Sequence, residues 1–151
     1  MPPQIQIISI KKLNKDYNLI AENYQKIIKY CLKITEITYS KKLPVTQIKQ
    51  FEAKLIEEYL EKKACKIVLD VLGESFNSQQ FTKLIEINLT QGKNIQFIIG
   101  GAFGLDKSII DKGDIRLSLS AMTLPHQLAK TILLEQIYRT QTILENHPYH
   151  K

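Results

Sequence analysis

Short apolar runs alternate along the chain with longer stretches whose apolar residues have helical spacing. The apolar runs predict five strands, at residues 5–10, 33–39, 66–71, 95–99 and 115–119. The stretches between and after them predict helices, at residues 19–31, 46–63, 79–91, 106–111 and 125–144. Strands that alternate with helices favour an α/β fold with a largely parallel sheet. No linker or internal repeat divides the sequence, so we expect one domain over residues 1–151.

The same pattern predicts which side chains face the core. The first helix should bury one apolar face, formed by Leu19, Ile20, Tyr24, Ile27, Ile28 and Cys31. The second helix should point its glutamates and lysines outward and bury Ile48, Phe51, Leu55, Tyr59 and Leu60. Gly73 should open a turn after the third strand, and Ser78 should cap the helix that follows.

The chain is basic, with a net charge of +6, and its lysines are concentrated in the N-terminal part. Residues 1–63 carry 12 lysines against 7 acidic residues. Such a balance permits binding to a phosphate backbone but does not require it. No apolar run approaches the ~20 residues that span a bilayer, and MPPQIQIISIKK lacks the features of a secretory leader. The two cysteines fit reduced core thiols, so we expect a cytoplasmic protein.

Three glycines follow the fourth strand, in the sequence GGAFG from Gly100 to Gly104. Glycine allows a tight turn and a close approach of the backbone to a ligand. Ligands of open parallel sheets bind beyond the carboxyl ends of the strands, where this loop should lie. A tight turn without any ligand is the alternative for this loop alone. A dinucleotide site is disfavoured, because GGxxG is not the GxGxxG fingerprint and no acidic residue follows at the expected distance.

The end of the fifth strand leads into the last helix through LSLSAMTLPHQLAK, residues 117–130. Pro125 suits the first turn of a helix, and the polar bend before it would leave backbone N–H groups free. Asp70, at the end of the third strand, is either a ligand-binding carboxylate or a solvated acid. Taken alone, each feature also fits an ordinary polar turn, with His126 as a first-turn histidine. Together, the three strand ends outline a shared crevice.

The chain ends in NHPYHK, a dense set of hydrogen-bond donors around one proline. Chain ends are usually frayed, yet histidine, tyrosine and lysine suit stacking on a base and pairing with phosphate. The two histidines have no cysteine or further acid nearby, so we expect no metal site here. No Ser-His-Asp or Cys-His arrangement can be assigned either.

Four segments together resemble one known family. They are FIIGGAFGL, LSLSAMTLPHQLAK, LLEQIYRTQTI and the closing HPYHK. On these residues the chain resembles the bacterial ribosomal RNA large-subunit methyltransferase H family (RlmH), a group within the SPOUT methyltransferases. The resemblance covers essentially the whole chain. It implies an α/β fold with a mostly parallel sheet, helices on both faces and a C-terminal trefoil knot, one of the few exceptions to the rule against knots.

The resemblance also implies a cofactor, a substrate and a partner. The family binds S-adenosylmethionine in the knot crevice, at positions that here are Leu69, Gly100, Leu119, Ser120, Ala121, Met122, Thr123 and Leu124. It methylates N3 of a pseudouridine in large-subunit rRNA and works as a homodimer on assembled ribosomes. Because that nitrogen must lose a proton, the candidates for catalysis are His126, His147 and Tyr149. The candidates for RNA contact are Lys11, Lys12, Lys41, Lys42, His150 and Lys151.

The chain departs from the family pattern in two places. Ala102 and Phe103 stand at the centre of the glycine loop, where many relatives carry Pro-Glu or Ser-Asn. Lys151 stands where many relatives carry arginine, and lysine cannot offer the bidentate fork of a guanidinium group. Two alternative functions stay open. One is a catalytically silent protein that binds ribosomes or RNA, and the other is a nucleotide-dependent enzyme on a doubly wound sheet.

Overall fold

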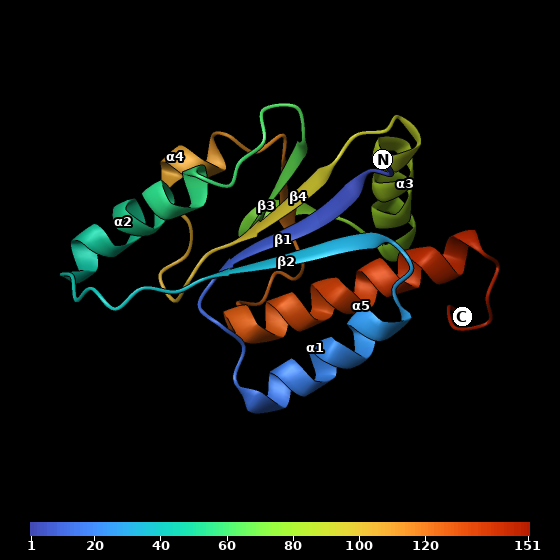
Figure 1. Ribbon diagram of the computed structural model, residues 1–151, viewed down its shortest axis with the longest axis horizontal. Coiled ribbons are helices and arrows are strands. Elements are labelled where there is room, and N and C mark those ends of the chain that lie inside the picture. The colour runs from blue at the N-terminus through green and yellow to red at the C-terminus, as the bar shows by residue number, and fades with distance from the viewer.

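The computed structural model, which describes residues 1–151, contains a five-stranded parallel sheet with helices on both faces (Figure 1). The strands are β1 (Gln4–Ile10), β2 (Cys31–Ile37), β3 (Cys65–Ser75), β4 (Ile95–Ile99) and β5 (Ile115–Ser118). The helices are α1 (Lys15–Ile27), α2 (Val45–Glu57), α3 (Ser78–Thr90), α4 (Lys107–Ile110) and α5 (His126–Leu144). The strand order is β2-β1-β4-β3-β5, and all neighbouring strands are parallel. The predicted α/β fold with a parallel sheet is confirmed.

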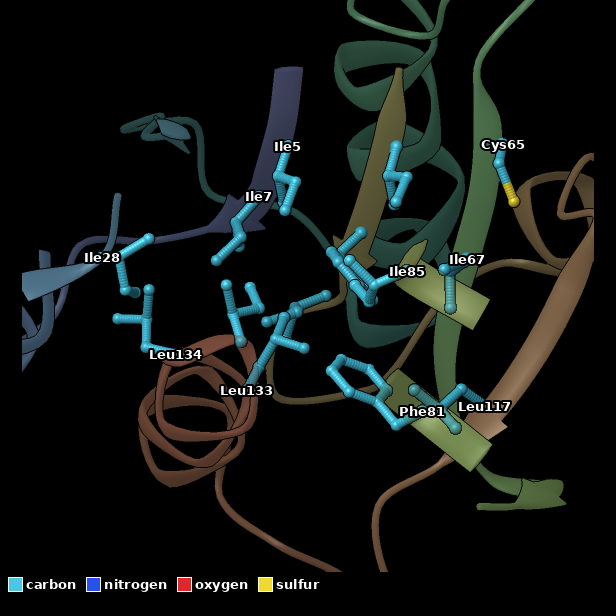
Figure 2. Close-up of a cluster of buried hydrophobic side chains, with 14 of the residues drawn as sticks. Ile5, Ile7, Ile28, Cys65, Ile67, Phe81, Ile85, Leu117, Leu133 and Leu134 are labelled. Carbon is cyan, nitrogen blue, oxygen red and sulfur yellow. The ribbon is translucent and has the colours of Figure 1, made fainter. Parts of the chain in front are cut away.

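An apolar layer lies on each face of the sheet. Helices α1, α3 and α5 cover one face, and α2 and α4 cover the other (Figure 1). On the first face, Phe81 and Ile85 of α3 and Leu133 of α5 join Ile67 of β3 in one apolar cluster (Figure 2). On the second face, Ile56 of α2 packs on the sheet. Strands β1 and β4 lie between both layers, which explains their nearly continuous apolar sequences.

Helix α1 leaves part of its apolar face uncovered, which corrects the predicted burial. Leu19, Ile20 and Ile27 keep 62%, 44% and 46% of their surface exposed. The helix packs beside α5 in the layer below the sheet, so its opposite side meets solvent. The cysteine prediction is also wrong in part. Cys31 is the first residue of β2 and is exposed, so Cys65 alone is a core thiol.

Helix α2 ends at Glu57 rather than at about Lys63, because the buried side chain of Gln96 binds the backbone that follows. Gln96 Nε2 donates to the carbonyl oxygen of Tyr59 at 2.7 Å, and its Oε1 accepts from the backbone N–H of Glu61 at 2.9 Å. These hydrogen bonds hold the segment in turns instead of a helix. Tyr59, which was predicted to face inward, is 41% exposed.

Two predictions around the end of β3 are wrong. The strand does not end in a turn at Gly73: its pairing with β5 shifts register between Leu69 and Glu74, and it then continues to Ser75. A Cβ on Gly73 would lie 2.5 Å from the carbonyl oxygen of Arg116, so glycine is what allows the two strands to pass this closely. Asn77, and not Ser78, caps α3, because the Asn77 side chain accepts from the backbone N–H of the third helical residue.

Candidate active site

Residues 69–71 of β3 and the loops that follow β4 and β5 border one cavity of about 850 Å³ at the carboxyl edge of the sheet. Most of the predicted cofactor positions line this cavity, namely Leu69, Gly100, Leu119, Ser120 and Met122–Leu124. Ala121 belongs to the same bend but does not line the cavity. Because parallel strands point toward a common edge, three segments that are distant in sequence meet there. The structure thus contains the crevice that the three strand ends predicted.

The turn after β4 requires glycine where the backbone packs most closely. A Cβ on Gly100 would lie 2.7 Å from the carbonyl carbon of Gly104, and one on Gly101 would lie 3.0 Å from Glu52 Oε1. Gly104 has a φ of +82°, which residues other than glycine rarely adopt. Phe103 also lines the cavity and is 49% exposed. The glycine loop, Gly100–Gly104, therefore presents bare backbone at its glycines and the side chain of Phe103 to the cavity.

Serine side chains shape the bend between β5 and α5. Ser118 Oγ donates to the carbonyl oxygen of Ser120 at 2.9 Å, and Ser120 Oγ accepts from the backbone N–H of Met122 at 3.0 Å. The backbone N–H groups of Thr123 and Leu124 make no backbone hydrogen bond. Free donors beside a cavity are suited to the polar edge of a ligand.

Asp70 also lines the cavity, but its charge is already paired. Arg116 Nε donates to Asp70 Oδ2 at 2.8 Å, and the backbone N–H of Leu72 donates to Oδ1 at 3.0 Å. Burial alone would raise the pKa of Asp70, but the hydrogen bonds from Leu72 and Arg116 outweigh it and lower the pKa. Of the two interpretations of Asp70, the structure favours a paired structural acid over a free ligand-binding carboxylate.

His126 is the first residue of α5 and lines the cavity beside Pro125. Its pKa is lowered, first by burial and then by the positive charges of Lys11 and Lys130, while Glu52 acts in the opposite direction. A lowered pKa keeps the imidazole neutral near neutral pH and able to accept a proton. Of the predicted candidates for catalysis, His126 is the one that the structure places in the cavity.

The remaining candidates lie in the C-terminal tail, residues 146–151, beyond the far end of α5. Tyr149 Oη donates to Glu135 Oε1 at 3.0 Å, and the Arg139 guanidinium lies 4.8 Å from the centre of the Tyr149 ring. Burial and then the hydrogen bond to Glu135 raise the pKa of Tyr149, so the phenol stays protonated. Arg139 also lies 3.0 Å from Nδ1 of His150, whereas His147 is exposed. Within one chain, the tail folds back along α5, because Tyr149 reaches Glu135, which lies nine residues, or about 14 Å of helix, from His126 in the cavity.

The lysines predicted to contact RNA are exposed and spread over three places. Lys11 and Lys12 directly follow β1, at the same edge of the sheet as the cavity. Lys41 and Lys42 lie in the loop before α2, and Lys151 ends the chain. All of these charges are available to a partner.

Sequence analysis missed the charged side chains that lie buried behind the cavity. Lys130 is 2% exposed and forms an ion pair with Glu36. Glu52 is 3% exposed, although the pattern predicted that the glutamates of its helix point outward. One signal was available for Lys130, because Leu134 and Ile137 follow it at spacings of four and seven residues on the buried side of α5.

Elsewhere, the structure offers a smaller cavity of about 280 Å³ at the opposite edge of the sheet, where the loops before β3 and β4 meet. It contains none of the predicted site residues. No group of three or more histidine, cysteine, aspartate or glutamate side chains is arranged to hold a metal ion. Nor does any helix combine the length and apolarity needed to cross a bilayer.

The sequence matches one family along nearly its whole length. The family described as Predicted SPOUT methyltransferase matches residues 3–150. Ribosomal RNA large subunit methyltransferase H 1 of Clostridium perfringens is 38% identical, over 97% of this chain and 99% of the relative. Ribosomal RNA large subunit methyltransferase H of Acetivibrio thermocellus is 35% identical, over 98% of this chain and 99% of the relative.

Solved structures share the fold at low sequence identity. A probable methyltransferase from Bordetella pertussis superposes with a TM-score of 0.61 at 11% identity, over 91% of this chain and 94% of that chain. A probable methylase family protein from Haemophilus influenzae superposes with a TM-score of 0.59 at 12% identity, over 100% of this chain and 72% of that chain. These structures establish the fold alone, whereas the sequence matches establish the family. The chain belongs to the ribosomal RNA large subunit methyltransferase H family of the SPOUT methyltransferases.

Proposed function

We propose that this protein transfers a methyl group from S-adenosylmethionine to N3 of a pseudouridine in large-subunit rRNA, on the assembled ribosome. One observation carries the proposal. Seven of the eight positions that the family resemblance assigns to the cofactor line a single cavity, in a chain whose relatives are named rRNA methyltransferases. The proposal includes one SPOUT domain over residues 1–151 and a cytoplasmic location, where ribosomes are found.

The cavity suits a nucleoside-sized cofactor. Its volume of about 850 Å³ falls within the range of roughly 300–1,000 Å³ for small-molecule sites. The apolar side chains of Leu69 and Leu119 would cover a purine ring, and the backbone at Gly100 would allow its close approach. The free N–H groups of Thr123 and Leu124 would donate to its polar edge. When bound, S-adenosylmethionine supplies an electrophilic methyl group on a sulfonium.

The protein's own tasks are to align the acceptor nitrogen with that methyl group and to remove its proton. Alignment matters most, because an in-line displacement depends on holding both reacting atoms in one geometry. N3 of a uracil-type ring is largely protonated near neutral pH. His126 lies in the cavity and has a lowered pKa, so its neutral imidazole is a suitable acceptor for this proton.

A homodimer would bring the tail to the cavity. Glu135, the partner of Tyr149 Oη, lies nine residues along α5 from His126, which is about 14 Å of helix. If His147 and Tyr149 assist the transfer, a second subunit would supply them to the cavity. The exposed apolar residues Leu19, Ile20 and Ile27 lie on α1, next to α5, and support an interface there.

The path of the chain into α5 supports the proposed trefoil knot. Strand β5 lies at one edge of the sheet and β2 at the other. At the start of α5, the side chain of Gln127 accepts from the backbone N–H of Asn14 at 2.6 Å. Asn14 lies between β1 and α1, so the bend at 119–125 crosses the carboxyl ends of several strands before α5 begins.

The rRNA would be held mainly through its phosphates. The exposed lysines Lys11 and Lys12 flank the cavity edge, and Lys41 and Lys42 add charge on the loop before α2. The tail of the second subunit would contribute His150 and Lys151 to the same RNA-binding surface. Such phosphate contacts position the RNA without reading its sequence.

The two alternative functions make different predictions for binding and transfer. A catalytically silent member would bind ribosomes and transfer no methyl group, and a nucleotide-dependent enzyme would bind NAD in place of S-adenosylmethionine. The test is calorimetric titration with each cofactor, followed by incubation with labelled S-adenosylmethionine and ribosomes that lack the modification. We expect binding of S-adenosylmethionine but not NAD, and label in large-subunit rRNA. Binding of NAD alone, or ribosomes that stay unlabelled, would refute the proposal.

A further inference from the structure

A buried carboxylate lies directly behind the glycine loop. Glu52 of α2 is 3% exposed, its Oε2 accepts from Tyr39 Oη at 2.6 Å, and its Oε1 has no hydrogen-bond partner. Burial and then the hydrogen bond to Glu52 raise the pKa of Tyr39 to about 12, so the phenol remains the donor. A Cβ on Gly101 would lie 3.0 Å from Oε1 and 3.1 Å from Oε2. Gly101 thus touches the carboxylate and also lines the cavity.

No ion pair neutralises Glu52 in the structure. Of the cations around the cavity, Lys130 is already paired with Glu36, and Lys11 and Lys49 are exposed to solvent. A buried carboxylate without a cationic partner is costly, and a buried oxygen without a donor is rare in native proteins. A positively charged ligand in the cavity would therefore stabilise the Glu52 carboxylate.

We propose that Glu52 sets the charge preference of the cavity, favouring a ligand with net positive charge over a neutral ligand of the same shape. This inference rests on the proposed function, in which the cofactor is S-adenosylmethionine. That cofactor carries one net positive charge, whereas its demethylated product, S-adenosylhomocysteine, has lost the sulfonium charge and is neutral. An ionised Glu52 behind Gly101 acts across a low-dielectric interior and needs no direct contact. It would favour cofactor over product and disfavour anionic nucleotides.

The test compares two ligands on three proteins by isothermal titration calorimetry. The ligands are S-adenosylmethionine and S-adenosylhomocysteine, and the proteins are wild type, Glu52→Gln and Glu57→Gln. Glutamine keeps the volume of Glu52 and a partner for Tyr39 but removes the charge. Glu57 is the matched control, because it lies on the same helix, is exposed and pairs with Lys112.

We expect Glu52→Gln to lower the affinity for S-adenosylmethionine about tenfold and the affinity for S-adenosylhomocysteine by less than about twofold. The Glu57→Gln control should leave both affinities unchanged. An equal loss for both ligands would overturn the inference, because it would mean that Glu52 supports only the structure. An unchanged preference for the charged ligand would overturn it as well.

Two provisions keep the test decisive. If wild type binds neither ligand, the proposed function itself fails, and this result is seen before any substitution is made. If Glu52→Gln does not fold, Glu52→Leu combined with Tyr39→Phe allows the same comparison, because replacing both partners of a buried hydrogen bond by apolar groups can be nearly neutral.

Discussion

Lys130 Nζ lies 2.7 Å from Glu36 Oε2, and this ion pair ties the beginning of α5 to the end of β2. The Lys130 side chain is only 3% exposed, and Glu36 also accepts from the backbone N–H of Leu13 at 3.0 Å. Because α5 begins directly after the bend at 119–125, the pair holds one wall of the cavity in place.

Breaking this pair should destabilise the protein. We expect Lys130→Met to lower the free energy of unfolding by about 2–4 kcal/mol, because it leaves Glu36 partly buried without its cation. Urea unfolding measures the effect. Lys29→Met is the control, because Lys29 pairs with Glu145 at 3.0 Å on the surface, and its loss should cost less than about 1 kcal/mol. Equal losses in the two variants would contradict the structural role of Lys130.

The same pair predicts a loss of stability in acid. Burial alone would raise the pKa of Glu36, but the hydrogen bonds from Lys130 and Leu13 outweigh it and lower the pKa. A lowered folded-state pKa stabilises the protein above the unfolded value of about 4.3, and this stability is lost as the pH falls through the folded value. The difference in unfolding free energy between wild type and Glu36→Gln should therefore shrink from about pH 7 to about pH 3. A difference that does not change with pH would refute this assignment.

Adding a methyl group to Gly101 should displace the glycine loop that borders the cavity. In Gly101→Ala the new Cβ would lie 3.0 Å from Glu52 Oε1 and 3.3 Å from Ile10 Cγ2, both of them buried. We expect a stability loss of about 1–3 kcal/mol and a drop in S-adenosylmethionine affinity of at least about tenfold. Gly92→Ala is the control, because its φ of +71° makes it costly for stability but it lies away from the cavity. It should leave cofactor affinity unchanged, and a similar loss in both variants would count against the cofactor site.

Substitutions in the tail should affect transfer and leave cofactor binding intact. Tyr149→Phe removes the hydrogen bond to Glu135, and we expect turnover to fall about two- to tenfold. His147→Ala should act in the same direction. Cofactor affinity, measured by calorimetry, should stay nearly unchanged because none of the tail residues lines the cavity. Tyr59→Phe is the control for turnover, because Tyr59 is also an exposed tyrosine but belongs neither to the tail nor to the cavity. A parallel loss of cofactor affinity would sink this assignment.

Much of the fold could be predicted from sequence, because the buried strands carry short apolar runs rich in β-branched residues. Strands β1 and β4 lie between two helical layers, so their sequences are apolar on both faces. Helix α1 shows the limit of the same reasoning. Its apolar face predicts burial, yet Leu19, Ile20 and Ile27 are exposed, because periodicity does not say whether the protein's own chain or a partner covers a face.

The candidate site was predictable only where local sequence determines geometry. The glycine loop and the bend before Pro125 carry their own turn residues, so their positions at strand ends could be predicted. The burial of Glu52 could not, because it depends on Tyr39 and Gly101, which come from other elements. The early end of α2 likewise depends on Gln96, a residue far along the sequence. Contacts between distant segments leave no local pattern to read.

The most direct test of the proposed function is the position of the methyl group. Ribosomes lacking the modification are incubated with the protein and labelled S-adenosylmethionine, and the rRNA is digested and analysed by mass spectrometry. We expect the label on N3 of one pseudouridine of the large-subunit rRNA and on no other nucleotide. Ribosomes that bind the protein but stay unlabelled, or a label on a different nucleotide, would contradict the account.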